Sequence, residues 1–339
     1  MRPLEFPFEA PTPGGELKDV APGIKWLRMP MPYRLDHINI YLVRDDKGWT
    51  IVDTGLDTDE SKAVWERVLA ELPADEPITR VLCTHSHNDH AGCAGWLTEK
   101  LRVPLYMSMG DYFSLRATSA GLNPHAWQLL QFYRQLGFAP QQIEDMLGSL
   151  AKMRFVSPAP QAYVRLREGG TIRLGANDWR VVVGEGHAPE HVSLFCAELG
   201  VLICGDQLLP RISANVSVNA VEPEANPLQL WLESLDRVGQ LPADALVLPS
   251  HELPYYGLAT RAAELRAHHE HQLDELAANC REHPGTVYEL MQRMFPRRKG
   301  LIDDFLAISE CFAHLSYLLR EGRVARHLQE DGSFYFQAA

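Results

Sequence analysis

Hydrophobic and polar positions follow two different periods along the first third of the chain. Short runs that alternate with period two, or that are apolar and β-branched throughout, predict strands. Between two of these runs, Val64, Val68 and Leu72 are spaced four residues apart, which predicts a helix over 60–72. A further helix is predicted to begin near Ala91. The runs that predict strands are 24–31, 38–44, 49–52, 78–83 and 103–107. Strands that alternate with helices are typical of a layered α/β domain.

The pattern changes over 108–152, which is predicted to be helical in two or three pieces divided by Pro124 and Pro140. Strand patterns then return, and they are followed from residue 259 by helical patterns and a final hairpin. The later strands are predicted at 163–166, 171–174, 179–183, 192–196, 201–204 and 245–248, the later helices at 227–240, 259–281, 286–294 and 304–321, and the hairpin at 324–327 and 333–336.

These patterns divide the chain into three parts. Residues 1–22 are rich in Pro and Gly and are expected to be an irregular lead-in. Residues 23–258 form the expected α/β domain, with 108–152 as a helical insert, and 259–339 form a C-terminal helical region.

Composition narrows the class of protein. The 339 residues are 46% hydrophobic and 22% charged, close to the globular average, which excludes disorder and collagen-like repeats. No apolar run approaches the roughly 18 residues of a membrane span, and the first fifteen residues lack the apolar segment of a secretory signal. Six cysteines without a CxxC pair indicate buried thiols and a reducing, cytoplasmic location. The net charge of −12 disfavours binding to nucleic-acid phosphates.

Histidines and carboxylates cluster directly after the strand predicted at 78–83. The sequence His85-x-His87-x-Asp89-His90 places four candidate metal ligands within six residues. Imidazole and carboxylate suit zinc, iron or manganese. Alternation in an extended segment sends His85 and His87 to one side, and a tight turn would bring Asp89 and His90 toward a neighbouring point. Four ligands in one short loop, split into pairs, therefore suggest two metal ions.

Further candidate ligands follow other predicted strands. His187 follows 179–183, Asp206 follows 201–204, and His251 follows 245–248. We expect them at one edge of the sheets, where layered α/β folds build active sites. Two metal ions activate water as a hydroxide and stabilise a leaving group, so the expected reaction is hydrolysis of an activated carbonyl or a phosphodiester. Asp89 or Asp206 is the expected carrier of a proton to the leaving group.

This order of motifs, preceded by Asp53 in Val52-Asp53-Thr54-Gly55, resembles the metallo-β-lactamase fold superfamily, specifically its glyoxalase II and β-lactamase-like group, over roughly 22–258. The resemblance implies an αββα sandwich of two sheets flanked by helices. It also implies a metal-dependent hydrolase with two divalent ions, zinc being expected and iron or manganese fitting as well. The implied ligands are His85, His87 and His187 on one ion and Asp89, His90 and His251 on the other, with Asp206 bridging the two.

Other residues are expected to support this site. Asp53 is expected to orient ligands rather than to bind metal. His191 is a candidate for the same role, with packing as the alternative, and His37 is a candidate to face the site. By contrast, His268, His269 and His271 lie on one predicted helix among charged residues and are expected to face solvent.

The insert suggests a class of substrate. It lies between the first and second ligand groups in the sequence and is rich in large apolar side chains, so we expect a helical lid over the metals. Trp127 and Phe132 are the side chains expected to contact substrate. An apolar lid favours a small-molecule thioester, ester or lactone with an apolar portion.

The C-terminal region keeps other functions open. Segments 285–291 and 313–324 resemble the winged-helix-like tail of some superfamily members, including β-lactamase-like endoribonucleases. Residues 255–339 carry ten Lys and Arg against twelve Asp and Glu, whereas a nucleic-acid-reading winged helix is normally basic. We therefore expect packing, lid support or an oligomer contact, such as that of a homodimer. A mononuclear-iron sulfur dioxygenase is a third alternative, and it has no evident use for the insert or the tail.

Overall fold

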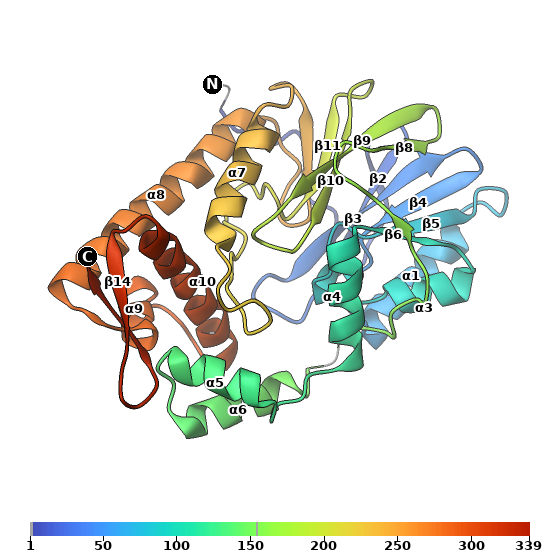
Figure 1. The fold of residues 1–339 in the computed structure, drawn as a ribbon. Coiled ribbons are helices and arrows are strands. Elements are labelled where there is room, and N and C mark those ends of the chain that lie inside the picture. The colour runs from blue at the N-terminus through green and yellow to red at the C-terminus, as the bar shows by residue number, and fades with distance from the viewer. Residues whose placement is uncertain (1–2, 154) are drawn as a thin grey trace. The chain divides into compact units, whose positions relative to one another are not determined.

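The computed structural model of the chain describes residues 3–153 and 155–339. The chain divides into two compact units, and Figure 1 shows the course of the ribbon through both. The first unit consists of Met1–Gly121, Arg154–Ala214 and Ser234–Ala263, and the second of Leu122–Met153, Asn215–Glu233 and Glu264–Ala339.

The first unit contains a seven-stranded sheet whose strands are neighbours in sequence order. Its first four strands pair antiparallel, and β4 to β7 pair parallel. The strands are β1 (Lys18–Ala21), β2 (Ile24–Pro30), β3 (His37–Asp45), β4 (Gly48–Val52), β5 (Ile78–Leu82), β6 (Leu105–Met107) and β7 (Val164–Arg165). The helices of this half are α1 (Asp59–Glu71), α2 (Asn88–Ala91), α3 (Ala94–Leu101) and α4 (Met109–Ala120).

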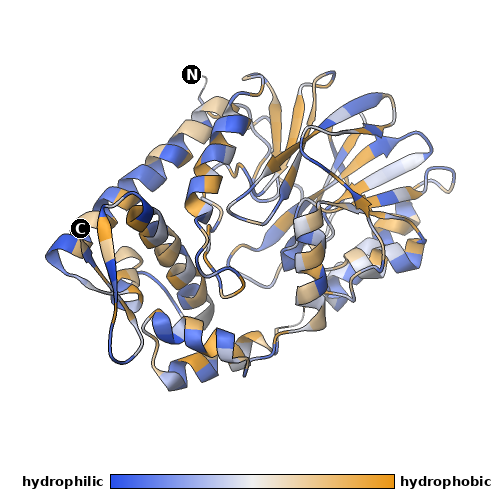
Figure 2. Ribbon diagram, viewed as in Figure 1, coloured by the Kyte–Doolittle hydropathy of each residue, from blue (hydrophilic) through white to orange (hydrophobic). Residues whose placement is uncertain are grey.

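A second sheet of five strands has the order β12-β11-β10-β9-β8. Its pairs are antiparallel except β11 with β12, which is parallel. The strands are β8 (Thr171–Leu174), β9 (Asn177–Gly184), β10 (His191–Cys196), β11 (Val201–Gly205) and β12 (Leu246–Pro249). Most residues of β10, β11 and β12 are hydrophobic, and Figure 2 colours hydrophobic residues orange.

Two apolar cores hold the first unit together. Trp26 and Tyr41 of the first sheet pack in one core with Leu194 and Ile203 of the second. The opposite face of the first sheet packs in another core with residues of α1, α3 and α4, such as Trp65. Alternate residues of β2 and β3 enter the two cores, because successive side chains of a strand point to opposite faces.

The strand directions collect polar side chains at one edge. In the first sheet β4, β5 and β6 run parallel, and in the second β9, β11 and β12 share one direction. Close packing at this edge requires glycine at the end of β11. Gly205 has φ +52°, and a Cβ atom there would lie 2.4 Å from His191 Nε2.

The second unit combines helices from the insert and the C-terminal region. It contains α5 (Trp127–Gln135), α6 (Pro140–Leu150), α9 (Val287–Met294), α10 (Leu301–Arg320) and a sheet of order β13-β15-β14, formed by β13 (Gly285–Thr286), β14 (Val324–Leu328) and β15 (Phe334–Ala338). Two helices, α7 (Pro227–Gly239) and α8 (Leu258–Glu282), contribute residues to both units. Within the second unit the Phe132 and Phe312 rings lie 6.0 Å apart, and Tyr288 N donates to Leu136 O at 2.9 Å.

These elements confirm the predicted α/β class, with mixed sheets, helices and a helical C-terminal region. Three details differ from the sequence interpretation. The expected irregular lead-in contains β1, which pairs with β2, and the helix expected near Ala91 is divided into α2 and α3. The prediction of a solvent-facing His269 was wrong: it is fully buried, with Nδ1 3.2 Å from His314 Nε2, whereas His268 and His271 are exposed.

Candidate metal centre

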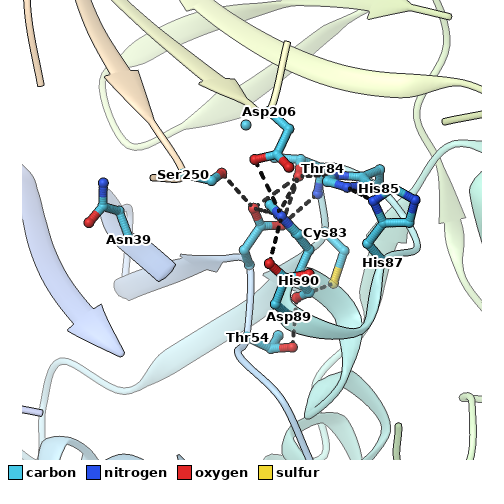
Figure 3. A network of polar contacts seen from close by, with 12 residues as sticks. Asn39, Thr54, Cys83, Thr84, His85, His87, Asp89, His90, Asp206 and Ser250 are labelled. Atoms are coloured by element: carbon cyan, nitrogen blue, oxygen red, sulfur yellow. Dashed lines mark hydrogen bonds and ion pairs between the residues drawn. The ribbon is translucent and has the colours of Figure 1, made fainter. Parts of the chain in front are cut away.

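Four of the predicted ligands form one group at the strand ends of the first unit. His85 and His87 follow β5, His187 follows β9, and Asp206 follows β11. One ligand atom from each lies within 4.8 Å of those of the others. His85 Nε2 is 2.9 Å from His87 Nδ1 and 3.2 Å from His187 Nε2, so three imidazole nitrogens converge on one point. Figure 3 shows His85 and His87 side by side.

Asp89, His90 and His251 form a second group. Asp89 and His90 lie on α2, and His251 follows β12. Asp89 Oδ2 lies 3.4 Å from His251 Nε2 and 3.6 Å from His90 Nε2. The carboxylate of Asp206 faces both groups, because its Oδ2 lies 3.4 Å from His187 Nε2 and its Oδ1 lies 3.4 Å from His251 Nε2.

The donor set fits divalent metal ions. Imidazole nitrogens and carboxylate oxygens are ligands of zinc, iron and manganese. Among residues 3–153 and 155–339, two buried atoms of this cluster, His90 Nε2 and Asp206 Oδ1, have no hydrogen-bond partner, and they face each other at 3.5 Å. A buried polar atom without a partner costs free energy, and a cation between these two atoms would satisfy both.

The electrostatics of the cluster also favour a bound metal ion. Burial and the surrounding imidazoles lower the pKa of His85 well below its ordinary value, so its ring is neutral as a metal ligand must be. Burial opposes ionisation of Asp206, but the facing His90 and His251 outweigh it and hold the Asp206 pKa well below its usual range. Burial opposes protonation of His90 as well, but the facing carboxylates, Asp206 first, raise its pKa. The carboxylates thus attract positive charge to the place where a metal ion would supply it.

Asp53 lies behind His90. It follows β4 with φ +64°, a left-handed conformation that Asp and Asn tolerate better than most residues. Its Oδ2 is 2.9 Å from His90 Nδ1, and its Oδ1 accepts from Thr84 N at 2.8 Å. With Nδ1 engaged, His90 presents Nε2 to the second group, which is the arrangement by which a carboxylate orients a metal-binding imidazole. Figure 3 shows Thr84 and His90 at the centre of the network.

The two remaining candidate histidines lie beside the ligand groups. His191 is fully buried, and its Nε2 accepts from Asp206 N at 3.1 Å, which ties β10 to the loop that carries Asp206. His37 is buried at the start of β3, and its carbonyl oxygen accepts from His251 Nδ1 at 2.9 Å.

Sequence reasoning missed Asp111, Asn39 and Thr84. Asp111 is buried in the first turn of α4 and accepts from the backbone N–H of Ser86. Asn39 Nδ2 donates to Pro249 O, and Thr84 Oγ1 contacts Asp53. One signal was available for Asp111: it lies three residues after the helix cap Ser108 and directly beyond β6, at the same sheet edge as the ligands. Asn39 lies inside a strand pattern and gave no such signal.

The two residues expected to contact substrate lie in the second unit. Phe132 is 3% exposed and packs against Tyr133 and Phe312. Trp127 is 66% exposed and borders a cavity of about 630 Å³ within that unit. The cavity is lined by Trp127, Leu130, Gln131, Arg134, Gln135, Pro140, Ile143, Leu328 and Gly332. A lid over the metal centre stays a prediction.

Comparison with protein families decides the class of this site. The model of the metallo-beta-lactamase superfamily matches residues 33–251, a range that contains all seven candidate ligands. The chain belongs to this superfamily. A second model, the metallo-beta-lactamase-like C-terminal domain, matches residues 273–339. The winged-helix character expected for this tail stays a prediction.

Two relatives match nearly the whole length of the chain, and a third matches part of it. A probable metallo-hydrolase, YqjP of Bacillus subtilis, is 26% identical over 317 residues, covering 92% of this chain and 96% of its own. A solved beta-lactamase domain protein from Burkholderia ambifaria is 40% identical, with a TM-score of 0.89, over 99% of this chain and 98% of its own. A hydroxyacylglutathione hydrolase of Cereibacter sphaeroides is 30% identical over 93 residues, 27% of this chain and 34% of its own.

The protein is therefore an enzyme, a metallo-hydrolase of the metallo-beta-lactamase superfamily, whose members generally bind divalent metals. Among residues 3–153 and 155–339, no helix is both long and apolar enough to cross a membrane.

Proposed function

We propose that this metallo-hydrolase uses two divalent metal ions to cleave a small-molecule thioester, ester or lactone with an apolar portion. His85, His87 and His187 hold one ion, Asp89, His90 and His251 hold the other, and Asp206 bridges them. Zinc is the expected metal, since imidazole-rich sets with carboxylate suit it, and iron and manganese accept the same ligands.

The observation that carries this proposal is the division of seven ligand atoms into two adjacent groups, with the two oxygens of Asp206 facing one group each. Seven ligands exceed what one tetrahedral ion takes up. In a mononuclear centre, the group formed by Asp89, His90 and His251 would bind no metal ion, although its three ligand atoms already lie close together.

When bound, two adjacent divalent ions lower the pKa of water to make a nucleophile and stabilise the negative charge that develops on the substrate. The protein's own residues then orient the reactants and move protons. The Asp89 side chain is 23% exposed, against 10% for Asp206. Asp89 is therefore the better placed carboxylate to take a proton from water and deliver it to the leaving sulfur or oxygen, through the oxygen that does not face His90 and His251, while Asp206 would stay between the two ligand groups.

Charge, exposed apolar surface and one relative support the substrate class. The net charge of −12 works against a polyanionic substrate such as RNA. Phe113 on α4, in the unit that holds the ligand groups, is 59% exposed and offers apolar surface to an acyl or ring portion of a substrate. The partial match to a hydroxyacylglutathione hydrolase favours an acyl thioester within this class.

Two measurements test the proposal. Elemental analysis of the purified protein should find two metal ions per chain at full activity. Hydrolysis assays of the same preparation should show turnover of acyl thioesters, esters or lactones. They should show little turnover of phosphodiesters or single-stranded RNA. One metal per chain at full activity would refute the dinuclear centre, and preference for RNA would favour the endoribonuclease alternative instead.

A further inference from the structure

Two buried residues outside the ligand set each contact the loops of a different ligand group. The first is Asp111, which is fully buried at the start of α4. Its Oδ1 accepts from Ser86 N at 2.9 Å, and its Oδ2 accepts from Glu190 N at 2.8 Å. Ser86 stands between His85 and His87, and Glu190 follows His187 by three residues. One carboxylate thus joins the two loops that carry the three histidines of the first group.

Only an acceptor with two oxygens can make this connection. Both loop partners are backbone N–H donors, and Ser108 Oγ lies 3.2 Å from the same Oδ2. Backbone amides in a buried place need an acceptor, and a carboxylate offers lone pairs in two directions. An amide side chain at this position would point its NH₂ group at either Ser86 N–H or Glu190 N–H, and that loop would lose its anchor.

The second side chain is His37, at the start of β3. Its ring Nε2 accepts from Glu252 N at 2.9 Å, and its carbonyl oxygen accepts from His251 Nδ1 at 2.9 Å. Glu252 has φ +67°, a left-handed conformation that L side chains rarely adopt, so the turn after His251 needs support. Asn39 Nδ2 supplies more of it by donating to Glu252 O at 2.9 Å.

The carbonyl bond also decides which nitrogen of His251 is available. With Nδ1–H donated to His37 O, Nε2 is the nitrogen that faces Asp89 and Asp206 and that could bind an ion. His37 therefore orients His251 through its backbone carbonyl, and its ring anchors the turn at Glu252. It has no comparable contact with His85, His87 or His187, just as Asp111 has none with His251, among the hydrogen bonds of the described residues.

We propose that Asp111 and His37 are separate positioning residues, Asp111 for the metal ion held by His85, His87 and His187 and His37 for the ion held by Asp89, His90 and His251. The inference rests on the proposed dinuclear function. It goes further by assigning to each ion its own supporting side chain, so that the two affinities can be changed one at a time.

The experiment measures metal affinity without substrate. Apo protein is titrated with zinc against a chromophoric chelator, and the cadmium-loaded protein is observed by cadmium NMR, which reports each ion as its own resonance. Asp111→Asn should weaken one of the two zinc affinities by about 10–100-fold, the range for groups that orient metal ligands, and shift one cadmium resonance. His37→Phe should weaken the other affinity by a similar factor and shift the other resonance. His87→Ala identifies the resonance of the first ion by its loss.

Two controls separate positioning from general destabilisation. His37→Gln restores an acceptor near Glu252 N and should recover much of the affinity lost in His37→Phe. Asp45→Asn changes another buried carboxylate of the first unit, which accepts from Asp46 N and Thr79 Oγ1 at the far end of β3. It should lower the thermal midpoint while both zinc affinities stay within threefold. If Asp111→Asn does not fold, Asp111→Glu, which keeps the charge and displaces the oxygens, replaces it.

The outcomes distinguish this inference from the function beneath it. Wild-type protein that binds fewer than two ions overturns the dinuclear function and the inference together. If wild type binds two ions, the inference alone fails when either variant weakens both ions equally, when both variants weaken the same ion, or when neither changes any affinity. If wild type binds two ions but cleaves no member of the substrate panel, the proposed substrate class is refuted. The inference about Asp111 and His37 is then still tested by the zinc affinities of the variants.

Discussion

Two histidines of this site use both of their ring nitrogens. The ring of His90 has Nδ1 at Asp53 and Nε2 toward Asp206, and the ring of His251 has Nδ1 at a backbone carbonyl and Nε2 toward Asp89. Each imidazole is therefore oriented from behind before any ion binds. Such pre-orientation removes part of the entropy cost of assembling a metal site.

Asp206 gives the sharpest test at the scale of one residue. Asp206→Ala should lower turnover by at least about 100-fold, because the variant loses a carboxylate that faces both ligand groups, and removal of even a supporting group costs about 10–100-fold. Elemental analysis should find fewer than two ions, while the thermal midpoint of the metal-free protein changes little, since the loss of the carboxylate also removes a buried charge. Retention of two ions with near-normal turnover would contradict the bridging role.

At the scale of elements, the ligands could be predicted from the sequence because they directly follow strands. Apolar runs mark strands, and the polar residues directly after β5, β9, β11 and β12 are brought to one edge by strand direction. Asn39 escaped prediction because it lies within a strand pattern and reaches Pro249 across the fold. The grouping of α5 and α6 with the C-terminal helices escaped as well, because a helical pattern shows that one face is buried but not which element covers it.

The two candidate lid residues on α5 should respond differently to truncation. Phe132→Ala opens a cavity next to Phe312 and should cost about 3–5 kcal/mol of unfolding free energy. Trp127→Ala changes an exposed side chain and should alter that free energy by about 0.5 kcal/mol or less. Denaturant unfolding measures both. If α5 contacts substrate, Trp127→Ala weakens long apolar substrates about tenfold or more and spares small activated esters. Equal losses for both substrate types would argue against a specificity role.

A buried histidine pair makes the contact between α8 and α10 sensitive to acid. Burial lowers the pKa of His269 to about 3 and that of His314 to about 4. The unfolded chain binds these protons near pH 6.5, so the stability that the neutral pair contributes is complete above about pH 6.5 and is lost as the pH falls toward 4. Glu310 acts in the opposite direction, because burial raises its pKa to about 7, and its contribution is complete below about pH 4.5 and lost as the pH rises to 7.

Between pH 6.5 and 4.5, two histidines therefore act against one carboxyl, and stability should fall on acidification. His269→Gln removes one of the two proton-binding groups. It should reduce the slope of unfolding free energy against pH by up to about 1.4 kcal/mol per pH unit in this range. Urea unfolding of both proteins at several pH values gives the slopes, and equal slopes would contradict the assignment of the pH dependence to this pair.

At the scale of the whole molecule, the two units differ in their candidate metal ligands. Both candidate ligand groups of the described residues belong to the first unit, whereas the His269–His314 pair belongs to the second. Ligand binding stabilises the state that binds, and its effect is strongest on the segments that make the contacts. Metal removal should accordingly destabilise the first unit more than the second.

Hydrogen exchange with and without a chelator measures this difference. In the metal-free protein the carboxylates of Asp89 and Asp206 lose the positive charge between them, and the ligand loops should open more often. Exchange should increase at 83–93, 184–191, 205–207 and 249–252, and stay nearly constant at 287–294 and 303–320 of the second unit. A matched sample of Asp206→Ala should already show the increased exchange before chelator is added, and chelator should then raise it little further. An equal increase in both units would mean that metal binding stabilises the chain as one cooperative whole, and no increase in the four loops would contradict their assignment as the metal-binding segments.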